Sequence, residues 1–392
     1  MTAPARRRGA ASNRAPATAV RGVLEVLPSG SGFLRFSSNG FQSSPDDVFV
    51  PQSFVRRHRL RTGDVIEGEA GQPPGRGKSA PLLSVARVSG ADPQEAQERP
   101  DFSSLPAAHP DEHLVLEGPP APGRSPTDYT NRVVDLIVPL GKGQRTLIVA
   151  PARAGKTMLL QGIIHGVATN YPEALLLVLL VDERPEEVTE MQMIGHGEVI
   201  ASSFDFPAER HVAIAEMTLE MARRQVEVGG DVVLVLDSLT RLARAYNTAE
   251  RGTGRTLSGG IDSGALEKPK RFFGSARSVP ERAGGGSLTI IATALTETGS
   301  RGDEVIFEEF KGTGNAEIVL DREIAERRIF PAINVERSST RREELLFTPD
   351  DLDKVHKLRR ALHSLPGPEA AQLLFRQMSD TKTNAELLAK IR

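Results

Sequence analysis

The sequence contains no cysteine and no tryptophan, and it has only three tyrosines. A chain without cysteine has neither disulfides nor thiolate metal sites, and this composition favours a cytoplasmic location. The longest apolar run, residues 174–181, is far shorter than the roughly 20 residues that span a bilayer. The N-terminal residues lack the apolar stretch of a secretion signal. We therefore expect no membrane partner.

Charge is nearly balanced over the 392 residues, at a formal net value of -2. That length predicts two or three folded units. The charges are unevenly distributed along the chain. Residues 1–21 carry no acidic residue and five arginines, Arg6, Arg7, Arg8, Arg14 and Arg21. A basic tail of this kind either contacts nucleic acid or is simply solvated. We expect residues 1–21 to be a disordered tail.

Residues 22–90 show five short alternating runs separated by Gly, Pro, Ser and Asp. Five such strands in about seventy residues are typical of a small barrel of the oligonucleotide-binding (OB) type. Residues 91–128 are rich in Pro, Asp, Glu and Ala with little periodicity, which predicts a linker.

From residue 129 onward the strands become continuous apolar runs, such as "TLIVA", "ALLLVLLVD", "DVVLVLD" and "SLTIIATAL". Strands of this kind are buried on both faces, as in a parallel sheet covered by helices. Residues 129–392 therefore form an α/β domain, and residues 349–392 are expected to close it with helices.

The stretch "APARAGKT", residues 150–157, resembles a phosphate-binding loop. A strand precedes it and a helix follows, so backbone N–H groups at the helix start would bind phosphate oxygens. Lys156 would contact the β- and γ-phosphates and Thr157 would ligate Mg²⁺. Ala150 stands where the pattern has glycine, which matters only if that position needs a positive φ.

Two carboxylates follow other apolar strands. Asp237 ends "DVVLVLD", where a Mg²⁺-binding aspartate belongs, and Glu183 lies in "VDERPEE", where a carboxylate would orient water. The alternative for each is an ordinary solvated turn. Because the ends of both strands lie at the same carboxyl edge of the sheet as the phosphate loop, we expect Asp237, Glu183 and the loop to form one site.

Two glycine-rich segments, 248–264 and 296–304, and the Arg-rich segment 321–346 also stand out. Arginines in such loops suit an RNA backbone, and arginines also stabilise transferring phosphoryl groups. The alternatives are mobile surface loops and solvated charges.

The predicted barrel carries aromatic residues near an arginine. Alternation puts Phe33 and Arg35 on one face and Leu34 and Phe36 on the other. Because single-stranded nucleic acid stacks on aromatic faces, we expect Phe33 and Arg35 to face outward and bind it.

At this point the chain resembles the bacterial transcription termination factor Rho family. The resemblance covers residues 22–392 and is most specific in "VDERPEEVTEMQ", "LDSLTRLARAYN", "KPKRFFGSAR", "IIATALTETGS" and "EEFKGTGN". It implies an OB-fold, cold-shock-like barrel followed by a RecA-like ATPase domain. It further implies a cytoplasmic homohexamer that uses ATP and Mg²⁺ to move along single-stranded RNA and release transcripts from RNA polymerase, together with elongation factors.

The resemblance also implies roles for individual residues. Glu183 would orient water, Arg341 would be the arginine finger, and Arg328 would be a second trans-acting arginine. Phe330 would pack on adenine, and Arg184 would lie beside the nucleotide. The other ATP contacts would be Gly141, Lys142, Gly143, Gln144, Arg145, Thr146, Arg153, Ala154, Gly155, Lys156, Thr157 and Met158, with Thr157 and Asp237 on Mg²⁺. RNA would be bound by Gly30, Ser31, Gly32, Phe33, Leu34, Arg35, Asp47, Val48, Phe49, Gly77, Lys78 and Ser79 in the barrel, and by Leu257, Ser258, Gly259 and Arg301 in the channel loops.

The chain departs from that family at three points. Ser31 and Ser79 replace common aromatics, and each lost stacking group would weaken RNA binding by roughly 1–3 kcal/mol. Arg153 replaces a usual lysine, which keeps the charge but changes the geometry. A short tail takes the place of a helical bundle found ahead of the barrel in many members.

Two other functions remain open at this stage. A rotary-ATPase-type subunit shares the core and an N-terminal β domain, although the aromatic barrel argues against it. A nonenzymatic RNA chaperone would use the barrel alone and carry a vestigial ATP site. The joint presence of Lys156, Thr157, Glu183 and Asp237 argues that the ATP site has kept its catalytic residues.

Overall fold

The computed structural model describes residues 17–391 except 76, 122, 250–257 and 263. The chain divides into two compact units, one ending at Glu98 and the other beginning at Arg99, with residues 37–40 grouped with the second. Most of the predicted Arg-rich tail, including Arg6, Arg7, Arg8 and Arg14, lies outside the described residues.

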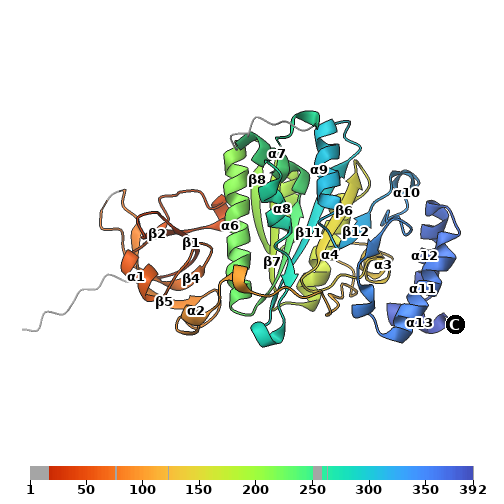
Figure 1. Cartoon of the computed structure of the whole chain (residues 1–392), viewed down its shortest axis with the longest axis horizontal. Helices are drawn as coiled ribbons and strands as arrows, with labels where there is room; N and C mark the ends of the chain where they lie inside the picture. The colour runs from red at the N-terminus through yellow and green to blue at the C-terminus, as the bar shows by residue number, and fades with distance from the viewer. Residues whose placement is uncertain (1–16, 76, 122, 250–257, 263, 392) are drawn as a thin grey trace, which may run out of the picture. The chain divides into compact units, whose positions relative to one another are not determined.

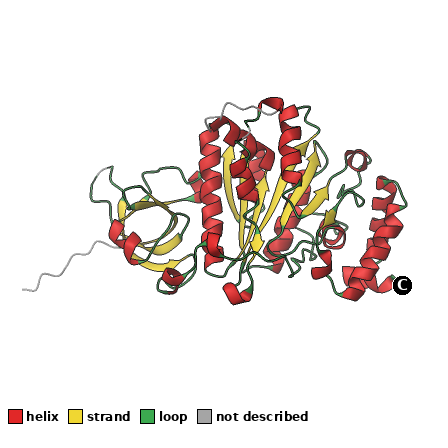
Figure 2. Cartoon of the chain, viewed as in Figure 1, coloured by secondary structure: helices red, strands yellow, loops and turns green. Residues whose placement is uncertain are grey.

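The N-terminal unit is a closed barrel of five strands, which confirms the predicted fold (Figures 1 and 2). Its order is β1-β2-β3-β5-β4, and only the β3–β5 pair is parallel. The strands are β1 (Thr18–Val26), β2 (Gly32–Arg35), β3 (Val48–Val50), β4 (Val65–Ala70) and β5 (Ala80–Val88), with helix α1 (Gln52–Arg57) between β3 and β4 and α2 (Glu95–Glu98) after β5.

Alternation along these strands fills the barrel with apolar side chains. Leu24, Leu34, Val50, Ile66 and Leu82 are buried together inside it. Strand β1 begins at Thr18, earlier than residue 22, because its first residues pair with the end of β4.

The second unit is built on an eight-stranded sheet in the order β13-β12-β6-β11-β9-β7-β8, with β10 paired to β11. All the strands except β10 and β13 are parallel to their neighbours. The strands are β6 (Arg145–Pro151), β7 (Leu175–Glu183), β8 (Glu198–Ser203), β9 (Asp231–Asp237), β10 (Arg277–Ser278), β11 (Ser287–Thr296), β12 (Ala316–Val319) and β13 (Ser339–Thr340).

Helices cover this sheet and close the chain (Figure 1). They are α3 (Thr130–Ile137), α4 (Lys156–Asn170), α5 (Pro185–Met193), α6 (Ala208–Glu227), α7 (Leu239–Ala249), α8 (Glu267–Phe273), α9 (Arg301–Lys311), α10 (Arg322–Glu326), α11 (Pro349–His363), α12 (Gly367–Ser379) and α13 (Asn384–Lys390). Successive strand residues such as Ile148 and Val149 are both buried, so both faces of the sheet are covered, as the continuous apolar runs predicted. None of the helices in the described residues is long and apolar enough to cross a membrane.

The segment expected to be a linker is packed against the α/β unit from residue 99 onward. Phe102, Leu114 and Leu116 are buried, and the Phe102 N–H donates to Glu227 Oε1 at 2.8 Å. The segment has almost no regular secondary structure, which is why its composition suggested a linker. Its isolated apolar residues nevertheless give it a fixed course along the domain.

Candidate functional site

The phosphate loop joins β6 to α4 at the carboxyl edge of the sheet. Gly155 is the N-cap of α4 and has a φ of 89°, a conformation that favours glycine. A Cβ on Gly155 would also lie 3.2 Å from the Phe330 ring, so glycine lets that ring approach the loop. Ala150 is buried within β6, outside the loop's left-handed positions, and its methyl group is accommodated there.

Within the loop, Arg153 has a φ of 65° and is exposed, whereas its neighbour Ala154 is buried. Thr157 lies in the first turn of α4, next to Lys156. The start of α4 therefore presents N–H groups, a hydroxyl and two cationic side chains within five residues, which is the donor set that a polyphosphate requires.

Lys156 lies between two buried carboxylates. Its Nζ donates to Asp237 Oδ1 at 2.7 Å and to Glu183 Oε1 at 3.2 Å. Burial opposes the charge of Lys156, but the two carboxylates outweigh burial and raise its pKa. Asp237 Oδ1 also accepts from the Thr293 hydroxyl at 2.6 Å, which fixes its orientation. The loop after β6 and the ends of β7 and β9 thus bring Lys156, Glu183 and Asp237 together, as expected from the sequence, and β11 adds Thr293, which the sequence did not indicate.

Glu183 is 1% exposed and has one oxygen available for a further bond. Its Oε1 contacts Lys156 and lies 3.5 Å from Arg241 Nε, whereas its buried Oε2 has no hydrogen-bond partner among the described atoms. Burial, reinforced by the negative charge of Asp237, raises the pKa of Glu183. A buried carboxylate with one unpaired oxygen can accept a proton or orient a water molecule.

A cavity of about 250 Å³ lies beside the loop. Phe330, Gly155 and Met158 line it, as does Arg328, which has a left-handed φ of 60°. The cavity brings together an aromatic ring and the start of α4, so a base could stack there while its phosphates reach the loop. Arg328, expected to act in trans, lies at its own chain's cavity.

One part of the cavity wall was missed by reasoning from the sequence. It comes from the packed segment before α3, which contributes Arg124, Thr127 and Asp128. Arg124 donates to Gln161 Oε1 at 2.7 Å and to the Met158 carbonyl oxygen at 3.1 Å, which attaches this wall to α4. The linker composition of the segment hid this role, and no local motif marks it.

The predicted nucleotide contacts in segment 141–146 are not brought to the phosphate loop. Segment 141–146 lies at the amino end of β6, and the loop lies at the carboxyl end, about 20 Å away for a seven-residue strand. There Arg145 Nε donates to the Thr313 carbonyl oxygen at 3.0 Å, and Gly141, Gln144 and Thr146 are buried. Lys142 is held 2.9 Å from Asp231.

Arg341 lies at that same amino end. Its N–H donates to the Asn315 carbonyl oxygen at 2.9 Å, and the charge of Arg341 contributes, after burial, to lowering the pKa of Arg145. Arg341 is exposed. Arg184, in contrast, is the N-cap of α5 directly after Glu183, and its exposed side chain is at the site edge.

The two glycine-rich segments lie side by side. A Cβ on Gly259 would come within 2.3 Å of the Gly302 backbone nitrogen, so Gly259 packs against the start of α9, where Arg301 is exposed. Asp303 in α9 binds Arg244 of α7 at 2.5 Å. Leu257 lies outside the described residues.

The barrel brings its three predicted RNA segments onto adjacent strands. Phe33 on β2 is paired with Phe49 on β3, and Val48 on β3 is paired with Ala80 on β5, directly after Ser79. The Phe33 and Phe49 rings make an edge contact with centroids 5.6 Å apart. Gly30, Ser31 and Gly32 precede Phe33, and Gly77 and Lys78 are exposed in the loop before β5.

Alternation on β2 is as predicted, but Arg35 is not a free cation. Its guanidinium lies 5.1 Å from the Phe33 ring centroid, on the predicted face, and is only 8% exposed. It is bound to Asp47 and lies 2.6 Å from Glu25. Arg35 therefore holds the Phe33 face in place. Leu34 and Val48, which were expected to contact RNA, are instead buried core residues of the barrel.

Two family models match the chain. The model described as "Rho termination factor, RNA-binding domain" matches residues 20–94, and "ATP synthase alpha/beta family, nucleotide-binding domain" matches residues 130–340. The first match covers the barrel and the second covers the phosphate loop, Glu183 and Asp237.

Curated relatives are similar along most of the chain. The transcription termination factor Rho of Gemmatimonas aurantiaca is 58% identical over 91% of this chain, which spans only 48% of that relative's length. Those of Cereibacter sphaeroides and Pseudomonas aeruginosa are 52% and 53% identical over 93% of this chain, and 85% and 86% of their lengths are covered.

Solved structures of lower identity share the fold. A prototypical ATPase from a type III secretion system of pathogenic bacteria aligns with a TM-score of 0.58 at 24% identity, covering 76% of this chain and 79% of that one. The assembled ATPase EscN of enteropathogenic E. coli aligns with a TM-score of 0.57 at 21% identity, covering 92% of this chain and 87% of that one.

Proposed function

This chain belongs to the transcription termination factor Rho family, and we propose that it hydrolyses ATP at the Lys156 site to move along single-stranded RNA and release transcripts. The observation that carries the proposal is the position of Lys156 between Glu183 and Asp237, at the start of α4. The barrel, with Phe33 and Phe49 on neighbouring strands, is the surface that first binds the RNA.

In this mechanism Lys156 and the N–H groups of residues 153–157 bind the phosphates, and Phe330 stacks on the base. Glu183 Oε2 accepts a hydrogen bond from the attacking water and orients it. Burial keeps bulk solvent away from the cluster, so the charges of Lys156 and Glu183 act in a low dielectric.

The donor set suits Mg²⁺. The Thr157 hydroxyl and the Asp237 carboxylate are oxygen ligands from two elements, and Mg²⁺ in such sites takes one or two protein ligands together with phosphate oxygens. When bound, the ion would neutralise charge that develops on the phosphates.

Hydrolysis also requires an assembly of several chains. Arg341 lies at the opposite end of β6 from Lys156, which supports the proposal that it completes a neighbour's site as an arginine finger in a homohexamer. The paired glycine segments with Arg301 then grip RNA, and the Arg244–Asp303 contact links them to α7, which follows Asp237. RNA polymerase and elongation factors in the cytoplasm are the partners of this activity.

The proposal is tested by measuring ATP hydrolysis by the purified full chain and by Lys156→Ala. We expect hydrolysis by the wild type and a loss of at least about 100-fold in the variant. A rate that the variant retains would contradict hydrolysis at the Lys156 site, whereas a wild type that binds RNA without hydrolysing ATP would favour a nonenzymatic RNA chaperone. The Rho-type RNA-binding match over the barrel argues against a rotary-ATPase subunit.

A further inference from the structure

Two histidines from different elements meet behind the phosphate loop. His165 lies on the third turn of α4 and His196 in the turn between α5 and β8. His165 Nδ1 is 3.1 Å from His196 Nε2, and the ring centroids are 5.2 Å apart. The nucleotide mechanism uses neither ring, because His165 is nine residues, or about 13 Å of helix, beyond Lys156.

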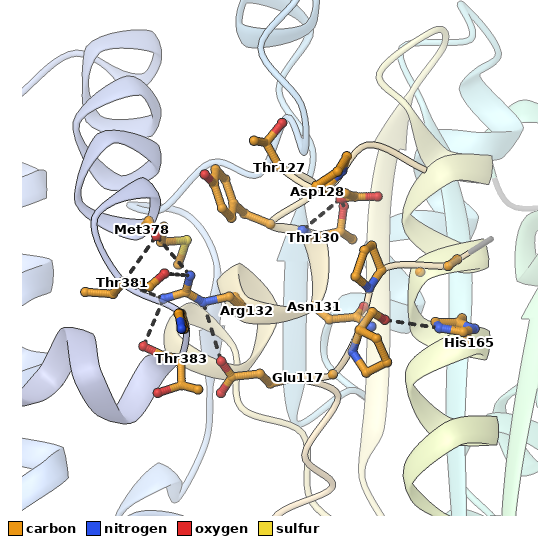
Figure 3. Close-up of a pocket in the computed structure, with 18 of the residues that line it drawn as sticks. Glu117, Thr127, Asp128, Thr130, Asn131, Arg132, His165, Met378, Thr381 and Thr383 are labelled. Atoms are coloured by element: carbon orange, nitrogen blue, oxygen red, sulfur yellow. Dashed lines mark hydrogen bonds and ion pairs between the residues drawn. The ribbon is translucent and has the colours of Figure 1, made fainter. Parts of the chain in front are cut away.

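The tautomer of His165 is set by a backbone carbonyl. His165 Nε2 lies 3.2 Å from the Pro119 carbonyl oxygen, a contact drawn in Figure 3. A carbonyl oxygen only accepts, so Nε2 carries the proton and the Nδ1 lone pair points at His196. A backbone carbonyl that orients one ring nitrogen while the other is left as a ligand is the usual support of a metal-binding histidine.

The two nitrogens are spaced as metal ligands are. Zinc–nitrogen bonds of 2.0–2.1 Å in a tetrahedral site put two ligand nitrogens about 3.3 Å apart. The 3.1 Å separation of Nδ1 and Nε2 is close to that value, but in this structure it is a hydrogen bond in which His196 Nε2–H donates to His165 Nδ1. An ion would be bound once His196 carries its proton on Nδ1 instead and the two rings turn so that both lone pairs face the ion.

Burial and access also fit a bound ion. His165 is 8% exposed on α4, whereas His196 is partly exposed in a turn. His165 also lines a cavity of about 540 Å³, which brings solvent to this part of the chain. Arg132 also lines that cavity, where it is bonded to Thr381 and Asn384 and lies 3.5 Å from Glu117.

We propose that His165 and His196 form a binding site for a first-row transition-metal ion such as Zn²⁺. Imidazole suits zinc, nickel, copper and cobalt, and the chain has no cysteine that would compete for them. The described residues supply no group of three or more His, Cys, Asp or Glu side chains for a metal, so water completes the coordination. The bound ion would fasten α4 to the α5–β8 turn.

The experiment uses the full chain without a polyhistidine tag, freed of metal. Zn²⁺ and Ni²⁺ are titrated by calorimetry, Co²⁺ by its visible absorption, and the midpoint of thermal unfolding is followed against metal concentration. We expect one equivalent bound per chain and a midpoint that rises with metal. His196→Ala and the more conservative His165→Gln should each weaken binding at least tenfold.

His363→Ala is the matched control, because His363 is an exposed histidine at the end of α11 and is not part of the proposed pair. Its neighbour Glu336 is 3.9 Å away. This variant should bind metal as the wild type does. The proposal is overturned if the wild type binds no metal at millimolar concentration, or if His196→Ala binds it with unchanged affinity and stoichiometry. Circular dichroism of both pair variants separates lost binding from lost folding, and two folded variants with unaltered affinity would also refute it.

Discussion

Arg341 lies next to Arg145, at the end of β6 opposite to the phosphate loop that contains Lys156. Both arginines are separated from the phosphate loop of their own chain by the length of β6. We proposed above that an arginine in that position acts on the phosphates bound by a neighbouring subunit. In the proposed mechanism, this relationship makes the assembly of chains part of catalysis.

Arg341→Ala should therefore abolish hydrolysis at the ATP site of the neighbouring subunit. An arginine finger contributes about 10³–10⁵ to kcat, so the variant alone should be nearly inactive while its ATP affinity is kept. When variant and wild-type chains are mixed, activity should fall in proportion to the number of mixed interfaces. Arg342→Ala, whose side chain is paired with Glu344 at 2.5 Å, is the control and should remain active.

Glu183→Gln should bind ATP normally and turn it over at least about 100-fold more slowly, because an amide cannot take up a proton. Glu186→Gln, an exposed neighbour in the first turn of α5, should keep the wild-type rate. Full turnover by Glu183→Gln would show that another group orients the water.

The pH dependence of hydrolysis should follow the same carboxylate. Burial and the charge of Asp237 raise the pKa of Glu183 above its ordinary 4.5. Since the ionised form orients water, kcat should fall as the pH drops through this raised value. A kcat that stays constant down to pH 4.5 would contradict the role of Glu183.

Phe330→Ala should weaken nucleotide binding without changing the phosphate chemistry. Stacking of a base on an aromatic ring contributes about 1–3 kcal/mol, so KM for ATP should rise about 5- to 150-fold while kcat changes little. Phe206→Ala removes a 37% exposed ring that stacks on Arg210 and serves as the control. Equal KM values for Phe330→Ala and the wild type would show that the base does not bind in this cavity.

Phe33 and Lys78 should contribute differently to RNA binding. Phe33→Ala loses a stacking surface, so RNA affinity should fall about 5- to 150-fold with an unchanged salt dependence. Lys78→Ala should instead reduce the slope of log affinity against log salt by about one. Filter binding over a range of salt concentrations measures both. Leu83→Ala, another exposed barrel residue, should have no effect on either quantity.

Buried Asp135 should make the stability of the α/β unit depend on pH. Burial raises the pKa of Asp135 to about 8, and burial lowers the pKa of His113, 3.8 Å away, to about 4. Between pH 6.5 and 8 the folded state keeps a proton on Asp135 that the unfolded chain has lost. Stability should thus fall by about 1.4 kcal/mol per pH unit at most.

Below pH 6.5 the unfolded chain binds a proton at His113, and the two effects oppose each other down to about pH 4. Asp135→Asn should remove the decline between pH 6.5 and 8. Its amide oxygen can still accept from the Glu117 N–H, which is 2.7 Å from Asp135 Oδ2. Thermal unfolding midpoints of both proteins across this pH range measure the difference, and parallel curves would contradict the assignment.

Local patterns were sufficient to predict both folds and the nucleotide cluster. Alternation placed Phe33 and Leu34 on opposite faces, and continuous apolar runs predicted the buried parallel strands. Parallel strands end at one edge, so Lys156, Glu183 and Asp237 were expected together.

Contacts that depend on tertiary packing could not be predicted in this way. Arg124 reaches the cavity because an irregular segment packs on α4, and nothing in its composition indicates that. Arg35 is held by Glu25 and Asp47, which are ten and twelve residues away along the chain. Segment 141–146 adjoins the phosphate loop in sequence, but a whole strand separates them in space.

The central claim is that RNA bound by this chain drives its ATP hydrolysis. The most direct measurement is the steady-state ATPase rate of the assembled full chain with and without C-rich single-stranded RNA. We predict hydrolysis that RNA stimulates many-fold, with the stimulation reduced in Phe33→Ala and all turnover lost in Lys156→Ala. A rate that is the same with and without RNA, or no hydrolysis under either condition, would contradict the account.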